Sequence, residues 1–325
     1  MRSLFQVLPF VLMTIVFWGI YGPVLHEGQH LMGADHEPSS LRPFICVGIA
    51  YFLVAVVVPV VWLRIRGESG RWTTTGTIWS FVAGIAGAVG ALGIILAFKS
   101  GGRPVYVMPL VFGLAPVVNT LITMKMTHTY RRVSAIFIAA TAVTAIGAAG
   151  VLFFKPGKGG ATIGDLGDML FAMILISIAI TALCWGAYGP VLHKGQAKME
   201  GSRLRPFLCV GLAYFLVAVA APLAMMPYFD EPGSWHIGGS LVSLAAGAAG
   251  ALGALGVIMA FNFGGRPIYV MPLIFGGAPV INTAATLTKS GTFDEVGGLF
   301  FLSLLMVIVG STGVLVFSPK PVKKE

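Results

Sequence analysis

Charged residues are scarce in this chain. Only 10% of its 325 residues are Asp, Glu, Lys or Arg, whereas 57% are hydrophobic, and the mean hydropathy is +0.89. A soluble domain carries roughly 25% charged residues, so this composition excludes a water-soluble globule and indicates an integral membrane protein. The net charge of +9 does not indicate nucleic-acid binding, because the basic residues lie in short loops and at the C-terminus rather than in one patch.

Cysteines are few, and membrane-embedded acids are missing from the predicted spans. The three cysteines, Cys46, Cys184 and Cys209, lie in apolar runs and predict neither a disulfide framework nor a metal site. No Asp or Glu lies in the middle of a predicted span. Because charge inside a membrane is usually functional, this lack argues against an acidic proton relay and against an anionic pocket for a cationic drug. We expect no cofactor.

Long apolar runs, in contrast, are abundant and occur in duplicate. Three segments return in the second half, identical at 10 of 12, 14 of 16 and 16 of 20 positions: residues 18–29 as 185–196, 41–56 as 204–219, and 101–120 as 264–283. Internal duplication of membrane-spanning segments is typical of secondary transporters. The sequence therefore predicts two equivalent units, residues 1–158 and 159–325.

Ten segments reach the roughly 20 apolar residues that a helix needs to cross a bilayer. They are approximately 4–25, 43–63, 77–98, 104–124, 133–154, 168–192, 206–227, 239–262, 267–288 and 296–317. Each copy supplies five, and because five is odd the second copy must insert upside down. We predict an all-α integral membrane protein with ten transmembrane helices, arranged as two five-helix inverted-topology repeats.

The positions of Lys and Arg predict the orientation of these spans. With a cytoplasmic N-terminus, 15 of the 21 Lys and Arg residues fall on the inside and 6 on the outside. The apolar N-terminal run continues into the repeated Trp-Gly element, so we interpret it as the first helix rather than as a cleaved signal peptide. We expect a multi-pass protein of the inner (plasma) membrane with cytoplasmic N- and C-termini.

Several motifs recur in the same order in both copies. Trp18 and Trp185 each precede a glycine at the end of the first span of their copy, and Ala-Pro-Val occurs at residues 115–117 and 278–280. The fifth span of the first copy also contains the small-residue run AIGAAGVLFF. In this five-plus-five frame, nearly the whole chain resembles the drug/metabolite transporter superfamily, most closely its EamA-like branch. The Glu that often follows the fourth helix in that family is missing here, and the YGPVLHxGQ element is additional. The resemblance implies a ten-helix bundle, a central cavity and alternating access, but it selects no substrate.

Repeated aromatic residues are the first candidates for a substrate site. Trp18 and Tyr21, with their counterparts Trp185 and Tyr188, stand next to Gly-Pro pairs. Proline loosens a helix end, and the exposed backbone groups can bind a ligand where they line a cavity. We expect these four side chains to line the cavity; an aromatic belt at the membrane interface is the alternative.

Repeated asparagines are the second candidates. Asn119 and Asn282 each follow a proline by one helical turn, so they can bind a substrate hydroxyl or carboxylate, or instead satisfy the carbonyl that the proline leaves free. Glycines recur at every third position within residues 84–93 and 247–256. They predict close helix packing rather than a phosphate-binding loop, because no strand precedes them.

Four arginines precede prolines at the starts of spans: Arg42, Arg103, Arg205 and Arg266. Positive charge on the outside goes against the usual bias, so its retention indicates a symmetric role in gating or anion contact. An Arg-Pro helix start places a forked donor beside free amide groups, which suits a carboxylate or phosphate. The alternative is that these side chains extend to lipid headgroups.

One motif points to a different class of function. His26, Glu27 and His30 match H-E-x-x-H, and His36 completes the longer pattern in which three histidines hold zinc and the Glu is the base. The second copy lacks the Glu and the second His, the stretch falls in a short predicted loop, and Gly28 interrupts the helix that the pattern needs. We therefore interpret it as a solvated polar loop without a metal. Metal binding there remains the alternative.

Together these features predict a secondary transporter, not an enzyme, that moves a small polar metabolite across the inner membrane. Without a carboxylate relay we expect a facilitator or exchanger, with His26 and His193 as the only repeated groups that titrate near neutral pH. The expected partners are the metabolite and the lipid bilayer, and a homodimer is compatible with the sequence. The alternatives are a metal-dependent membrane enzyme at the HEGQHLMGADH stretch and a non-transporting scaffold.

Overall fold

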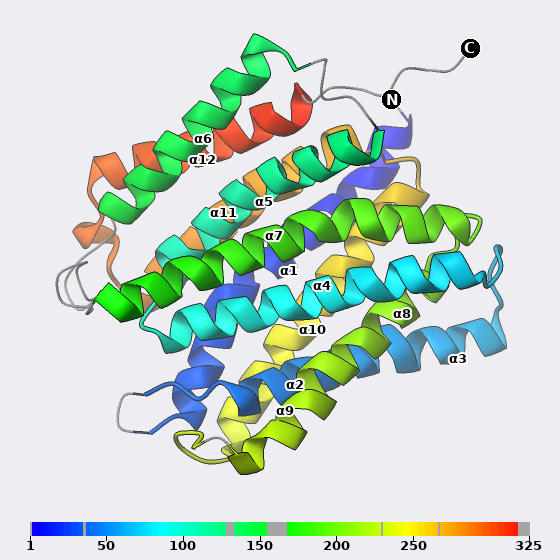
Figure 1. Cartoon of the computed structure of the whole chain (residues 1–325), viewed down its shortest axis with the longest axis horizontal. Helices are drawn as coiled ribbons and strands as arrows, with labels where there is room; N and C mark the ends of the chain where they lie inside the picture. The colour runs from blue at the N-terminus through cyan, green and yellow to red at the C-terminus, as the bar shows by residue number, and fades with distance from the viewer. Residues whose placement is uncertain are drawn as a thin grey trace.

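The computed structural model describes residues 2–34, 37–127, 133–154, 168–228, 230–265 and 267–317, and these residues are mainly helical (Figure 1). The first copy contains α1 (Arg2–Met32), α2 (Leu41–Phe52), α3 (Val58–Ile65), α4 (Thr74–Lys99), α5 (Pro104–Thr127) and α6 (Ala135–Phe153). The second contains α7 (Asp168–Lys198), α8 (Leu204–Phe215), α9 (Ala221–Met225), α10 (Ile237–Asn262), α11 (Pro267–Ser290) and α12 (Gly298–Val316). The π-helical turns η1 (Leu53–Val57) and η3 (Leu216–Ala220) join α2 to α3 and α8 to α9.

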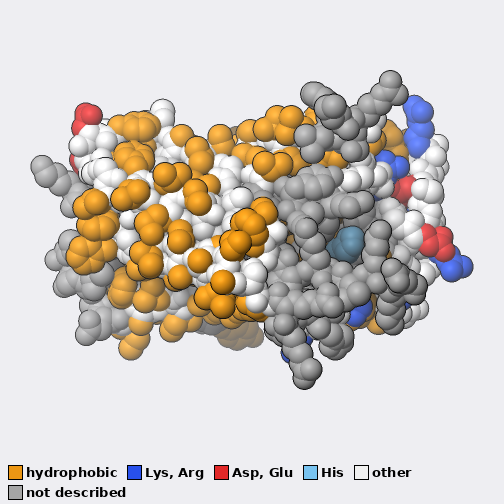
Figure 2. Space-filling view, turned by 90° about the horizontal axis from the view of Figure 1, so that it is seen from above, with side chains coloured by type: hydrophobic (Ala, Val, Ile, Leu, Met, Phe, Trp, Pro, Cys, Tyr) orange, Lys and Arg blue, Asp and Glu red, His pale blue; other side chains and the backbone are white. Residues whose placement is uncertain are grey.

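Eight helical segments in the described residues are long and apolar enough to cross a membrane. They are α1, α2 with α3, α4, α5, α6, α7, α8 with α9, and α10. Figure 2 shows hydrophobic side chains over much of one face, while most of the visible charged side chains lie towards one end. A lipid-facing surface has this character because charge in the hydrocarbon region is costly. The chain is an all-helical, multi-pass membrane protein.

Both long first helices continue beyond the point that the sequence predicts. α1 passes through Pro23 to Met32, and α7 passes through Pro190 to Lys198. The prediction that His26 to His30 form a solvated loop broken at Gly28 is therefore wrong. Gly28 lies directly against Ser243 of α10, so tertiary packing, rather than local helix propensity, keeps this end of α1 helical.

Helices of one copy pack mainly against helices of the other. α1 lies along α10 and α11, and α7 lies along α4 and α5. Glycines make this close approach possible, since the Trp185 indole lies against Gly90 of α4 and the Trp18 indole against Gly253 of α10. The predicted packing role of the glycine series is confirmed, and the two halves of the chain share one core.

The helices α2 and α8 cross beside α10 and α4 (Figure 1). A Cβ atom on Gly48 would lie 2.9 Å from the Ala218 Cβ atom, and one on Gly211 would lie 2.8 Å from the Ala55 Cβ atom. Just beyond each glycine, Tyr51 stacks on Tyr214 with ring centroids 3.6 Å apart and ring planes 2° from parallel. The crossing therefore brings together an aromatic pair, one ring from each copy.

Candidate functional site

An aromatic cavity lies where the two copies meet. It contains about 580 Å³ of empty space and is lined mostly by aromatic rings. Eight aromatic side chains line it, four from each copy: Trp18, Tyr21, Tyr51 and Phe112, with Trp185, Tyr188, Tyr214 and Phe275. The structure thus brings together the four aromatic residues that the sequence singles out. Sequence reasoning missed the other four, although these are also repeated in register.

The two tryptophans are held by hydrogen bonds to glycine carbonyls. Trp18 Nε1 donates to the Gly250 oxygen at 3.2 Å, and Trp185 Nε1 donates to the Gly87 oxygen at 3.1 Å. Each bond links the two copies: the first joins α1 to α10, and the second joins α7 to α4. Because both indole N–H groups are used in this way, the tryptophans present ring surface rather than hydrogen-bond donors to the cavity.

Two tyrosine hydroxyls supply polar chemistry in this cavity. The hydroxyl oxygens of Tyr21 and Tyr188 are buried and have no hydrogen-bond partner among the described residues. A buried hydroxyl without a partner costs about 1–3 kcal/mol. These two groups are therefore the polar atoms of the cavity that a bound molecule would stabilise most.

A second cavity adjoins the aromatic one on the side of α5 and α7. It contains about 540 Å³ of empty space, and Met271 lines both cavities. Its other lining residues are Asn119, Thr123, Met126, Gly189, Pro190, His193 and Phe261. The candidate Asn119 and the repeated His193 thus lie together, next to the Gly-Pro pair of α7.

Each lining residue of the second cavity has a counterpart in the opposite copy, and the counterparts of Met271 and Asn119 are packed more tightly. Met108, the counterpart of Met271, lies so close to Gly22 that a Cβ atom there would be 2.6 Å from its Cγ atom. A Cβ atom on Gly189 would lie 3.9 Å from the Met271 Cε atom, while Asn119 Nδ2 would lie at 3.0 Å, about as close as Asn282 Oδ1 would lie to a Cβ atom on Gly22. Asn282 is fully buried and donates from Nδ2 to the Pro104 oxygen at 2.9 Å.

The C-terminal ends of α1 and α7 also differ in packing, and the contacts around α1 are again the tighter ones. His26 lies edge-on to Phe98, with ring centroids 5.0 Å apart, and also contacts His30 at 4.5 Å. The ring centroids of His193 and Phe261, the counterparts of His26 and Phe98, are 5.9 Å apart. Positions that are equivalent in sequence therefore have unequal packing, closed around α1 and open around α7.

Among the described residues, an ion pair joins the two helices on the closed side. Lys289 Nζ of α11 lies 2.5 Å from Glu27 Oε2 of α1. The equivalent positions are Met126, which lines the second cavity, and Lys194, whose Nζ lies 3.7 Å from the centroid of the Trp79 ring. The ends of α1 and α11 are therefore linked by charge, whereas Lys194 contacts α4 instead of α5.

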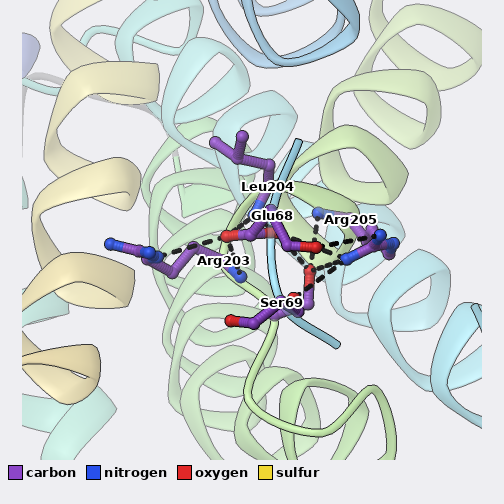
Figure 3. Close-up of polar contacts among 6 residues, drawn as sticks. Glu68, Ser69, Arg203, Leu204 and Arg205 are labelled. Atoms are coloured by element: carbon purple, nitrogen blue, oxygen red, sulfur yellow. Dashed lines mark hydrogen bonds and ion pairs between the residues drawn. The ribbon is translucent and has the colours of Figure 1, made fainter. Parts of the chain in front are cut away.

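Arg205 and its neighbours bind a loop rather than the cavities (Figure 3). Arg205 Nη1 donates to the Ser69 oxygen at 3.1 Å and lies 3.5 Å from Glu68 Oε2. The Glu68 carboxylate also accepts hydrogen bonds from the backbone N–H groups of Arg203 at 2.9 Å and Leu204 at 3.2 Å. A carboxylate at a helix N-terminus satisfies free amide groups, so Glu68 caps α8 from the loop that follows α3.

Arg42 takes part in the equivalent arrangement at the start of α2. Its Nη1 donates to the Pro232 oxygen at 2.8 Å, and Glu231 accepts from the backbone N–H of Leu41 at 2.7 Å and from Ser39 Oγ at 2.6 Å. Burial raises the pKa of Glu231, but the hydrogen bonds from Ser39, Ser40 and Leu41 outweigh burial and hold this pKa below its usual range. We call these two sites the Glu68 cap and the Glu231 cap.

Three candidate residues from the sequence remain: Arg103, Arg266 and His36. Arg103 is half-buried at the start of α5, where its carbonyl accepts from the Val107 N–H at 3.0 Å. Arg266 and His36 lie outside the described residues. Among the described residues, no three His, Cys, Asp or Glu side chains are grouped to hold a metal ion. The metal-dependent alternative stays a prediction.

Comparison with known proteins shows the fold but names no family. No family model and no curated protein matches the chain. One solved structure, known only as the crystal structure of a protein, covers 96% of this chain and 97% of its own length, with a TM-score of 0.59 at 19% identity. At this identity the likeness concerns the fold alone, so any function must be argued from the two cavities.

Proposed function

We propose that this protein is a secondary transporter that moves a small organic metabolite by alternating access. In this proposal α11 and α12 are the ninth and tenth spans, and the two copies are inverted five-helix repeats of the EamA-like type. The protein lies in the inner membrane with both termini in the cytoplasm. It works as a facilitator or exchanger, and the aromatic cavity with Asn119 holds the substrate.

The unequal packing of equivalent residues is the observation that carries this proposal. The second cavity opens beside Gly189 and Met271, while Met108 fills the same place beside Gly22. Two copies that share these near-identical segments can exchange these packings, and the aromatic cavity between them then becomes reachable from the opposite side. Alternating access in inverted repeats works by this kind of exchange around a fixed site.

The predicted topology indicates which side of the membrane the second cavity faces. With cytoplasmic termini, the α7–α8 connection lies inside and the α1–α2 connection lies outside. The second cavity next to His193 then faces the cytoplasm, and the ion pair between Glu27 and Lys289 lies at the outer end. The described arrangement corresponds to an inward-facing state.

Thiol accessibility tests the proposal with two matched positions. Thr123 lines the second cavity, and Thr286 is its counterpart with a buried hydroxyl. Each is changed to Cys in a background in which Cys46, Cys184 and Cys209 are replaced by Ala. We expect a membrane-impermeant maleimide to label Thr123→Cys at least tenfold faster in inside-out vesicles than Thr286→Cys in right-side-out vesicles.

Exchange between states distinguishes a transporter from a scaffold. A transporter must visit the opposite state, so Thr286→Cys should label slowly but completely from the outside, and labelling there should trap that state and slow the labelling of Thr123→Cys from the inside. If Thr286→Cys stays unlabelled from the outside in a folded protein, or if both positions label equally fast from both sides, the alternating-access proposal is wrong.

A further inference from the structure

The lining of the aromatic cavity contains rings and hydroxyls but no charge. None of the described residues that line it is Asp, Glu, Lys, Arg or His. Arg42 and Arg205 are engaged at the Glu231 and Glu68 caps instead. An ion entering a cavity within the membrane loses its hydration, and this cost is large when no opposite charge receives it.

The aromatic surface favours flat ligands. Ligand pockets typically bind apolar surface with a few polar groups that fix orientation, and the lining of this cavity has that character. Aromatic rings bind other rings by offset stacking or edge-to-face contact. The rings of Trp18 and Trp185 are fixed for such contact, because each indole is held by its hydrogen bond to a glycine carbonyl.

The unpartnered hydroxyls define the polar part of the ligand. The hydroxyls of Tyr21 and Tyr188 come from equivalent positions of the two copies, and each can donate or accept one hydrogen bond. We propose that the aromatic cavity binds a planar, uncharged aromatic compound that carries a hydroxyl or similar hydrogen-bonding group. This inference rests on the proposed transport function and names its substrate class.

A charge series on one ring system tests the ligand class. Indole-3-ethanol is neutral, tryptamine is a cation at pH 7 and indole-3-acetate is an anion, while the indole ring stays the same. Binding to the full-length protein in detergent is measured by isothermal titration calorimetry. We expect the Kd of indole-3-ethanol to be at least tenfold lower than the Kd of either charged probe.

Two substitutions test the role of the hydroxyls. Tyr21→Phe and Tyr188→Phe keep the ring, and at least one should raise the Kd of indole-3-ethanol about three- to tenfold, the usual effect of one lost hydrogen bond. Binding of unsubstituted indole, which lacks the hydroxyl, should change less than twofold. Tyr228→Phe is the matched control, since Tyr228 is 86% exposed and does not line the cavity.

Three results would overturn the inference. Tighter binding of tryptamine would assign the rings to a cation, and tighter binding of indole-3-acetate would assign the site to an anion. Absence of saturable binding of indole-3-ethanol to folded protein would remove the ligand class altogether. The maleimide labelling of Thr123→Cys and Thr286→Cys needs no ligand, so the transport proposal can stand when this inference fails.

Discussion

Identical residues have different surroundings in the two copies, and the asparagines show what this means for stability. Asn282 bonds to the Pro104 carbonyl across two helices, whereas Asn119 borders a cavity. Of the two roles that the sequence leaves open, Asn282 has a structural one, although its partner is on α5 rather than on its own helix. An asparagine beside a cavity is available to a ligand, so the two positions separate stability from binding.

Replacing each asparagine by leucine tests this separation. Asn282→Leu should lower the free energy of unfolding by about 1 kcal/mol, because an interhelical hydrogen bond in a membrane contributes about 0.6 kcal/mol on average and the Pro104 carbonyl loses its partner. Asn119→Leu should have less than half of this effect. Unfolding in mixed detergent micelles measures both, and equal losses would show that Asn119 is structural too.

At the scale of helices, the Glu231 cap should make stability depend on pH. The pKa of Glu231 is lower in the folded protein than the usual Glu value of about 4.3. The cap therefore stabilises the protein fully above the usual pKa and loses this effect as the pH falls through the lower, folded pKa. We expect Glu231→Gln to lower the Tm at pH 7 by about 2–4 °C, the effect of losing a helix cap.

The Tm difference between the wild type and Glu231→Gln should shrink as the pH falls below about 4. Thermal unfolding followed by circular dichroism from pH 7 to pH 3 measures this convergence. Asp230→Asn is the matched control, because it removes one charge from the same exposed loop without touching the cap. A Tm difference that stays constant down to pH 3 would contradict the role of the ionised carboxylate.

The helical segments could be read from the sequence more easily than their ends or partners. Each predicted span coincides with a helix or a pair of helices, because long apolar runs determine this level of structure. Pro23 and Pro190 misled the prediction of helix ends, since packing against α10 and α4 sustains helices that local propensity would stop. Likewise, Glu68 and Glu231 look like ordinary loop acids until the fold brings each to the helix start that it caps.

At the scale of the whole molecule, the sequence could not reveal which side is open. Met108 and Met271 are the same residue in the same motif, and so are His26 and His193, yet their packing differs. In the proposed alternating-access cycle this difference belongs to one of two conformations. A sequence that suits two related packings has to contain some contact that sets their balance. The pair of Glu27 and Lys289 has no equivalent ion pair, because the matching positions are Lys194 and Met126, which makes it the candidate for that contact.

Breaking this ion pair should shift the molecule towards the outward-facing state. Its two side chains are 39% and 52% exposed, and an exposed pair contributes at most about 1 kcal/mol. Glu27→Gln or Lys289→Met should therefore raise the rate of maleimide labelling of Thr286→Cys from the outside by about two- to fivefold. Asp294→Asn, which removes an exposed charge near the same end of α11, should leave this rate unchanged.

The exchanged pair, Glu27→Lys combined with Lys289→Glu, separates the ion pair from the individual charges. If attraction between α1 and α11 holds the outer side closed, the exchange restores slow labelling, because the same two helices are again linked by opposite charges. Persistent fast labelling would mean that the Glu27 or Lys289 side chain acts through other contacts. In that case the closed packing of Met108, His26 and Phe98 alone sets the balance between the two states.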